Sequence, residues 1–149
     1  STSTSLVFLI TMALVMMDSG MTTALALKVS EITGGLYPIV APFFGVLGSF
    51  ITGSNTNSNV IFGKFQVDLA AALGVNGFIM AGLQSIAGSI GVSLGPTTIL
   101  MASSASGLTG RESEIYKIVI KPVLLTALIM GILNYLLLIV FRLNLGGVL

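Results

Sequence analysis

The sequence contains no cysteine and no histidine in its 149 residues. The lack of cysteine excludes disulfides and thiolate metal sites, and the lack of histidine removes the commonest metal ligand and the usual physiological proton carrier. Any proton chemistry therefore falls to the five carboxylates of Asp and Glu. We predict neither a metal site nor a cofactor, and no motif marks a catalytic residue.

Charged residues are also scarce. They make up 7% of the chain, against roughly a quarter in ordinary soluble domains, while hydrophobic residues make up 54% and the mean hydropathy is +1.07. The net charge is +1, and the six Lys and Arg residues form no basic face of the kind that binds nucleic acid. The sequence therefore predicts an all-α, multi-pass integral membrane protein in a lipid bilayer, with no nucleic-acid partner.

An uncharged polar segment, 53–59, interrupts this apolar chain and consists of Gly53, Ser54, Asn55, Thr56, Asn57, Ser58 and Asn59. The apolar arms beside it, 36–51 and 60–73, would be about 24 Å and about 21 Å long as helices, shorter than the roughly 30 Å hydrocarbon core. The sequence therefore predicts a re-entrant hairpin over 36–73 with its tip at 52–59. Membranes allow such irregular backbone only where it is buried in protein or lines a watery cavity.

The first predicted span, 6–32, contains a possible break at 18–20. Asp and Ser are preferred at helix starts, and Gly relaxes the backbone, so the helix is expected to restart near Met21. Asp18 lies within this apolar span, where a charged side chain is costly and is a functional candidate by default. A plain capping role for Asp18 is the alternative.

Two further spans follow the hairpin. The span 77–107 is predicted to break at 95–96, because proline removes a donor and clashes with the preceding turn. Thr97 or Thr98 is expected to cap the half-helix that follows. The last span, 118–141, has no interruption.

A polar stripe is predicted on one face of the 77–107 span. Ser85, Ser89 and Ser93 recur every four residues, which places them on one helical face. Gly91 and Gly95 have the spacing of a small-residue pair, which favours close packing against another helix.

The remaining polar residues have structural interpretations. Lys64 and Asp68 are four residues apart and are expected to form an ion pair. Asn134, the strongly polar residue inside the last span, is expected to join two helices by a hydrogen bond. Tyr37 is expected at the membrane interface, where tyrosine is enriched.

The predicted breaks and hairpin tip suggest anion chemistry without basic side chains. Each one places Ser, Thr or Asn at the start of a helical segment, where free backbone N–H groups and the helix dipole favour anions. Paired broken helices that point their N-termini at a carboxylate are a recurrent transporter solution. A small carboxylate that carries hydroxyl groups suits such a site, because amides and hydroxyls both donate and accept hydrogen bonds.

The sequence resembles the C-terminal part of the L-lactate permease family over essentially its whole length. The resemblance rests on the segments Asp18-Ser19-Gly20-Met21-Thr22, Gly53 to Asn59 with Phe62-Gly63 and Gln66, and Gly107-Leu108-Thr109-Gly110-Arg111-Glu112-Ser113. It implies a plasma-membrane importer of L-lactate and related 2-hydroxy monocarboxylates such as glycolate, driven by proton symport. Because those permeases are much longer, we expect the remaining N-terminal half, or a second copy, as a partner.

The triplet Ser54-Asn55-Thr56 also resembles the hairpin tips of the divalent-anion/sodium symporters. That resemblance implies one half of an inverted-repeat, ion-transporter-type fold with a re-entrant hairpin and a discontinuous transmembrane helix. We predict Asp18 as the proton-coupling residue. The predicted substrate-binding residues are Ser54, Asn55, Thr56, Asn57, Ser58, Asn59, Ser89, Thr97 and Thr98.

Three alternatives remain open from the sequence. Amide, hydroxyl and carbonyl oxygens at a hairpin tip also bind hard cations, so sodium coupling is possible. Asp18 and Asp68 are the carboxylates that an intramembrane enzyme would use as a pair. A purely structural membrane subunit, whose polar tip serves helix packing, is the third alternative.

Overall fold

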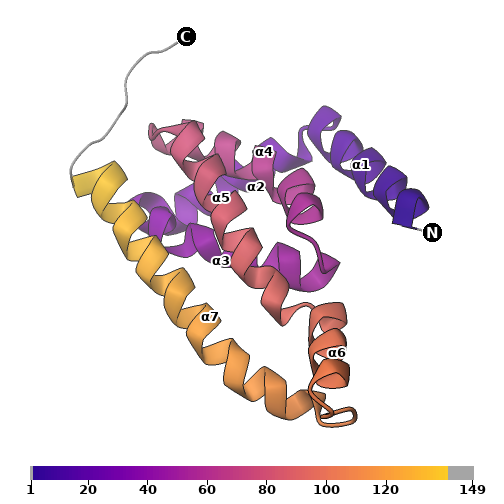
Figure 1. Ribbon diagram of the computed structural model, residues 1–149. Helices are drawn as coiled ribbons and strands as arrows, with labels where there is room; N and C mark the ends of the chain where they lie inside the picture. The colour runs from indigo at the N-terminus through magenta and orange to yellow at the C-terminus, as the bar shows by residue number, and fades with distance from the viewer. Residues whose placement is uncertain (1, 141–149) are drawn as a thin grey trace.

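The computed structural model describes residues 2–140, and every regular element in this range is helical. In chain order the elements are α1 (Thr2–Asp18), α2 (Met21–Thr33), η1 (Gly34–Leu36), α3 (Tyr37–Thr52), α4 (Asn55–Leu73), α5 (Gly77–Gly91), η2 (Val92–Leu94), α6 (Pro96–Ala105), α7 (Glu112–Tyr135) and η3 (Leu136–Val140) (Figure 1). The predicted all-α class is confirmed. Residue 141, the end of the last predicted span, lies outside the described residues.

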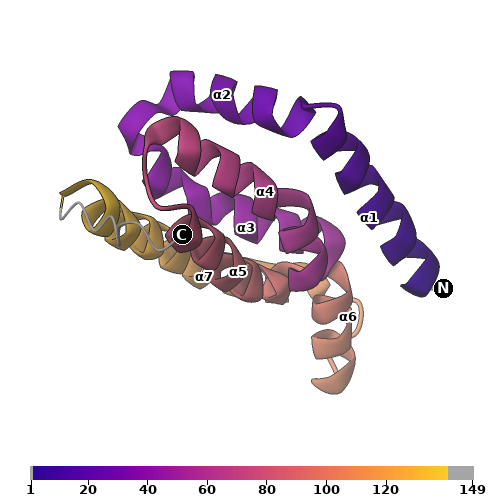
Figure 2. The ribbon, with the colours of Figure 1, turned by 90° about the horizontal axis from the view of Figure 1, so that it is seen from above.

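Three stretches of the described residues are long and apolar enough to cross a membrane: Met21–Thr52, Gly77–Leu94 and Glu112–Leu138. The first stretch comprises α2, η1 and α3, and Figures 1 and 2 show the chain turning back at η1. At about 1.5 Å per residue, α2 and α3 are about 20 Å and about 24 Å long, below the roughly 30 Å hydrocarbon core. Neither helix is long enough to cross such a bilayer alone.

The chain breaks between α1 and α2. Gly20 separates the two helices at φ 74°, a left-handed conformation that glycine adopts without steric cost. Asp18 ends α1 and does not cap α2, because the N-cap is Gly20 and no side chain bonds the first turn. The alternative capping role of Asp18 is therefore wrong. Figure 2 shows α1 and α2 meeting at an angle, with α2 outside α4.

The link between α3 and α4 is short. Gly53 ends α3 at φ 65° and donates its N–H to Ser49 O at 2.8 Å. Ser54 then caps α4, because its hydroxyl accepts the Asn57 N–H at 3.3 Å. This cap starts the helix at Asn55, so most of the polar segment forms the first turns of α4. The irregular tip is confined to 53–54, whereas the sequence predicted 52–59.

Helix α3 lies at the centre of the packing, against α4, α5 and α7. Its neighbours approach closely where they carry glycine, as small residues allow in membrane helix pairs. A β-carbon placed on Gly91 of α5 would lie 2.6 Å from Val46 Cα, and one on Gly131 of α7 would collide with Ile39 O. Asn134 of α7 donates to Pro38 O at 3.1 Å, which confirms its predicted role between helices.

Tyr37 lies in the core and not at an interface, which corrects the sequence prediction. Its side chain is 0% exposed and packs against the rings of Phe44 and Phe65, with centroids 6.0 Å and 6.4 Å away. Burial is tolerated because the hydroxyl donates to Gln66 Oε1 at 2.8 Å. Tyrosine is usually buried only when its hydroxyl finds such a partner.

We predict that Gly131→Ala destabilises the full-length protein. The added methyl group meets the Ile39 carbonyl, so α3 and α7 must move apart, and overpacking of this kind costs about 1–3 kcal/mol. The measurement is the thermal unfolding midpoint in detergent. Gly82→Ala is the matched control, because no described atom outside its own stretch of helix lies within 4 Å of a β-carbon there. Equal midpoints for the two variants would contradict the packing.

Candidate functional site

The hairpin tip meets the break between α5 and α6. A β-carbon placed on Gly53 would lie 3.2 Å from the Thr97 hydroxyl oxygen, and one placed on Gly95 would lie 3.3 Å from Gly53 Cα. The segment 53–54, between α3 and α4, and the segment 92–95, between α5 and α6, are therefore in van der Waals contact. No charged residue occurs in 45–60 or 84–100, so this contact, which we call the tip junction, is polar and uncharged.

Helices α4 and α6 both begin at the tip junction, and Figure 1 shows them leaving it in opposite directions. The first N–H groups of a helix have no acceptor inside the helix, and they carry partial positive charge. Ser54 satisfies one such group of α4, whereas α6 begins at Pro96 without any side-chain cap. Thr97 and Thr98 lie inside the first turn of α6, which corrects their predicted capping role.

Polar side chains line the contact between α4 and α5 next to the tip. Asn55 Nδ2 donates to Ser89 Oγ at 2.9 Å, and Asn59 Nδ2 donates to Ser85 Oγ at 3.1 Å. The two asparagines are four residues apart on α4, and the two serines are four residues apart on α5. Each pair therefore lies on one face of its helix, and the two faces meet. Ser93, the third serine of the predicted stripe, donates its hydroxyl to Ile90 O at 2.7 Å, at the end of α5.

Three oxygen atoms near the tip are buried without a hydrogen-bond partner among the described residues: Ser49 Oγ, Asn55 Oδ1 and Asn59 Oδ1. A β-carbon on Gly88 would collide with Asn55 Oδ1 and lie 3.0 Å from Ser49 Oγ. Because glycine has no side chain, position 88 leaves room for the Asn55 amide. Leaving such an atom unpaired costs about 1–3 kcal/mol, so each is a place where a ligand or water would be stabilising.

A chain of buried hydrogen bonds holds α3, α4 and α5 together behind the tip. Gln66 Oε1 accepts from Tyr37 Oη, and Gln66 Nε2 donates to Gln84 Oε1 at 3.0 Å. Gln84 Nε2 donates to Ser58 Oγ, which donates to Gly45 O, both at 3.1 Å. These four side chains are at most 1% exposed. We call this set the glutamine network.

Sequence reasoning missed the glutamine network. The available signal was a glutamine within each of two helices that carry much apolar sequence, Gln66 and Gln84. The network also takes up Ser58, a predicted substrate contact, whose side chain is 0% exposed and points into the core. Thr56 is exposed, Asn57 is half-buried, and neither side chain bonds to another described residue.

The structure does not bring Asp18 to the tip junction. Asp18 is exposed at the end of α1. Thr23, near the start of α2, donates to Asp68 Oδ2 at 2.9 Å. Asp68 lies about 20 Å along α4 from Asn55, at about 1.5 Å per residue. Asp68 is therefore far along α4 from most of the predicted substrate contacts, and Asp18 makes no hydrogen bond or ion pair with any of those contacts among the described residues.

A cavity of about 440 Å³ lies between α3 and α7, and its walls are apolar. It offers no polar contact for a carboxylate, so we place the candidate site at the tip junction. In the described part of the chain, no group of three or more Asp or Glu residues is arranged to hold a metal ion. The residues that line the cavity include Phe43, Val46, Phe50, Leu94, Tyr116 and Leu124.

Comparison with known proteins identifies a family that the chain resembles. The family model for L-lactate permease matches residues 1–141. The chain is 38% identical over 118 residues to the glycolate permease GlcA of Escherichia coli (strain K12), which covers 79% of this chain and 21% of that protein. No solved structure matches the chain.

Other relatives are named L-lactate permeases. The protein of Bacillus subtilis (strain 168) is 34% identical over 119 residues, which covers 80% of this chain and 21% of the relative. The protein of Escherichia coli (strain K12) is 34% identical over 116 residues, which covers 78% and 21%. The chain therefore spans about a fifth of the length of these relatives, at 21% each.

We predict that Gly88→Ala changes the tip junction without unfolding the protein. The new methyl group takes the place of Asn55 Oδ1, and it meets flexible side chains, which move more easily than backbone. The Asn55 amide must then swing away from Ser89. The loss of this hydrogen bond is expected to lower the stability of the full-length protein by about 1 kcal/mol, which the thermal unfolding midpoint in detergent measures. Gly82→Ala, on the same helix, is expected to keep the wild-type midpoint, and equal midpoints for the two variants would contradict the role of Gly88.

Proposed function

The chain belongs to the L-lactate permease family, and from this premise we propose that it is part of a secondary active transporter of L-lactate and related 2-hydroxy monocarboxylates such as glycolate. The uptake is driven by proton symport across the plasma membrane. The observation that supports the proposal best is the meeting of two helix N-termini, those of α4 and α6, at an uncharged polar junction. Relatives named as glycolate and L-lactate permeases support the substrate class.

The substrate carboxylate binds at the tip junction in this proposal. First-turn N–H groups of α4 and α6 donate to it, as helix N-termini do for anions. The hydroxyls of Ser54, Thr56, Thr97 and Thr98 lie on the same two helix starts. Such a site holds a single negative charge without a basic side chain, which keeps binding weak enough for release.

The amides and serines of the α4–α5 face recognise the 2-hydroxyl group. Asn55, Asn59 and Ser89 offer both donors and acceptors there, and Asn55 Oδ1 and Asn59 Oδ1 have no partner among the described residues. Asn57 lies half-buried on the first turns of α4 and completes the predicted set. Ser58 contributes through the glutamine network, because its hydroxyl is committed to Gln84 and Gly45.

We infer that α3 and α4 form a re-entrant hairpin. Two observations support this: α3 is about 24 Å long, and α4 begins with a run of polar residues and is not among the apolar candidate spans. The described residues form one half of an inverted repeat, with α5, η2 and α6 as its discontinuous helix. The remaining half, or a second copy, closes the site from the other side.

Asp18 is the first candidate for the proton-coupling carboxylate. It lies at the break between α1 and α2, is exposed within the described residues, and has no hydrogen-bond or ion-pair partner among them. A carboxylate at a helix break inside a membrane is a functional candidate by default. It takes up a proton on one side of the membrane and releases it on the other.

We predict that Asn55→Ala lowers L-lactate uptake about tenfold, because the 2-hydroxyl group of the substrate then loses its partner in a buried site, which costs about 1–3 kcal/mol. The measurement uses proteoliposomes that hold the full-length protein, with and without an inward proton gradient, and with choline in place of sodium. Ser30→Ala is the control, because its hydroxyl bonds to its own helix at Leu27 O. Wild-type protein that takes up no lactate or glycolate would contradict the proposed substrate class.

Asp18→Asn is expected to keep the exchange of labelled lactate across the membrane and to lose the accumulation that the gradient drives. The amide keeps the shape of the side chain but cannot carry the proton. Both quantities are measured on the same proteoliposomes. Accumulation at the wild-type level would remove Asp18 from the coupling mechanism.

A further inference from the structure

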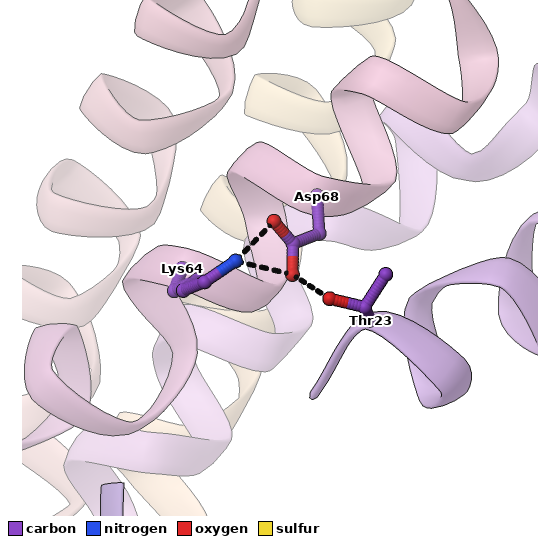
Figure 3. A network of polar contacts seen from close by, with 3 residues as sticks. All are labelled: Thr23, Lys64 and Asp68. Atoms are coloured by element: carbon purple, nitrogen blue, oxygen red, sulfur yellow. Dashed lines mark hydrogen bonds and ion pairs between the residues drawn. The ribbon is translucent and has the colours of Figure 1, made fainter. Parts of the chain in front are cut away.

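A second carboxylate, Asp68, lies in a half-buried ion pair on α4. Lys64 Nζ contacts Asp68 Oδ1 at 2.6 Å and Oδ2 at 2.8 Å, and Thr23 of α2 donates to Asp68 Oδ2 at 2.9 Å. Figure 3 shows the three side chains converging from α4 and α2. The Lys64–Asp68 pair that the sequence predicts is therefore confirmed, and it has an additional partner on another helix.

This pair differs from the other two ion pairs of the described residues. The side chains of Lys28–Glu31 are 71% and 65% exposed, and those of Arg111–Glu114 are 59% and 50% exposed. Lys64 and Asp68 are 36% and 14% exposed. An ionisable pair that is shielded in this way inside a membrane protein is costly, and such residues usually mark ion or substrate pathways.

The contact between Thr23 and Asp68 joins two parts of the fold. Among the described residues it is the one side-chain hydrogen bond that links α1 and α2 to the rest of the structure. Next to this hydrogen bond, α2 packs against α4 through apolar residues such as Ala26 and Leu69. The charge of Asp68 therefore directly affects the strength of the hydrogen bond between α2 and α4.

Few other ionisable groups face Asp68. Helices α3 and α5 carry no charged residue, and Tyr37 of α3 is committed to Gln66. Helix α1 contributes Asp18 at its end. The charged residues of α2 are Lys28 and Glu31, which pair with each other. Lys64 is thus the one cation that contacts Asp68 among the described residues.

We propose that Asp68 is a protonation site of the transport cycle, whose charge sets the contact between α2 and the α4 arm of the hairpin. The inference rests on the proposed proton-coupled function. It adds a second carboxylate to Asp18. Unlike Asp18, Asp68 has two partners among the described residues, a cation and a hydrogen bond from a neighbouring helix, so its charge affects a contact between helices.

The step is a single protonation. A proton from the adjoining water adds to one Asp68 carboxylate oxygen and forms an O–H bond, so Asp68 becomes neutral. Lys64 keeps its proton, and the pair changes from zero net charge to +1. The attraction that holds Lys64 against the carboxylate is lost, and the strong charge-assisted bond from Thr23 becomes an ordinary one. Release of the proton on the other side restores the pair.

The test separates a protonation site from a structural ion pair. The variants are Asp68→Asn and the double variant K64Q/D68N, in the full-length protein in proteoliposomes. The double variant removes both charges together and leaves an amide pair of similar size, so no charge is left unpaired. The matched control is K28Q/E31Q, which removes the exposed ion pair of α2 in the same way.

Two quantities are measured for each protein: exchange of labelled L-lactate without a gradient, and accumulation with an inward proton gradient. We expect K64Q/D68N and Asp68→Asn to exchange lactate within about twofold of wild type, while the gradient adds nothing to their accumulation. The control is expected to match wild type in both quantities.

Gradient-driven accumulation by either Asp68 variant would overturn the inference and leave the proposed function standing. A loss of accumulation in the control as well would also overturn it, because the effect would then belong to any charge change on these helices. Wild-type protein that exchanges lactate but shows no response to the gradient would overturn proton coupling itself, and the inference with it.

Discussion

The hairpin of α3 and α4 depends on the hydrogen bonds that Gln66 and Gln84 make inside it. A bilayer supplies no partner for a polar group, so each buried amide must be satisfied within the protein. The glutamine network meets this requirement with partners from α3, α4 and α5. Because every link is buried, the three helices are held as one body, and the tip at 53–54 has a fixed place on it.

Small residues complete this arrangement. Gly88 makes room for the Asn55 amide beside the tip, and Gly53 lets the chain turn within two residues and touch Thr97. The result is two helix starts, α4 and α6, at one uncharged junction. The candidate site is therefore built from backbone orientation and amide groups, and the charged residues Lys64 and Asp68 lie farther along α4, at the contact with α2.

The sequence was informative where a local pattern carries the signal. The all-helical class, the Lys64–Asp68 pair and the helix contact of Asn134 follow from composition and spacing. The expectations about helix caps and about the surroundings of Tyr37 were wrong. Ser54 captures the Asn57 N–H and shortens the tip, and the buried Tyr37 depends on a partner 29 residues away along the chain.

The most direct test of the central claim is a cryo-EM structure of the full-length protein with bound L-lactate. We predict density for the carboxylate within hydrogen-bond distance of the first-turn N–H groups of both α4 and α6, with the 2-hydroxyl group beside Asn55. Lactate bound elsewhere, such as in the apolar cavity between α3 and α7, with α4 and α6 apart from it, would contradict the claim.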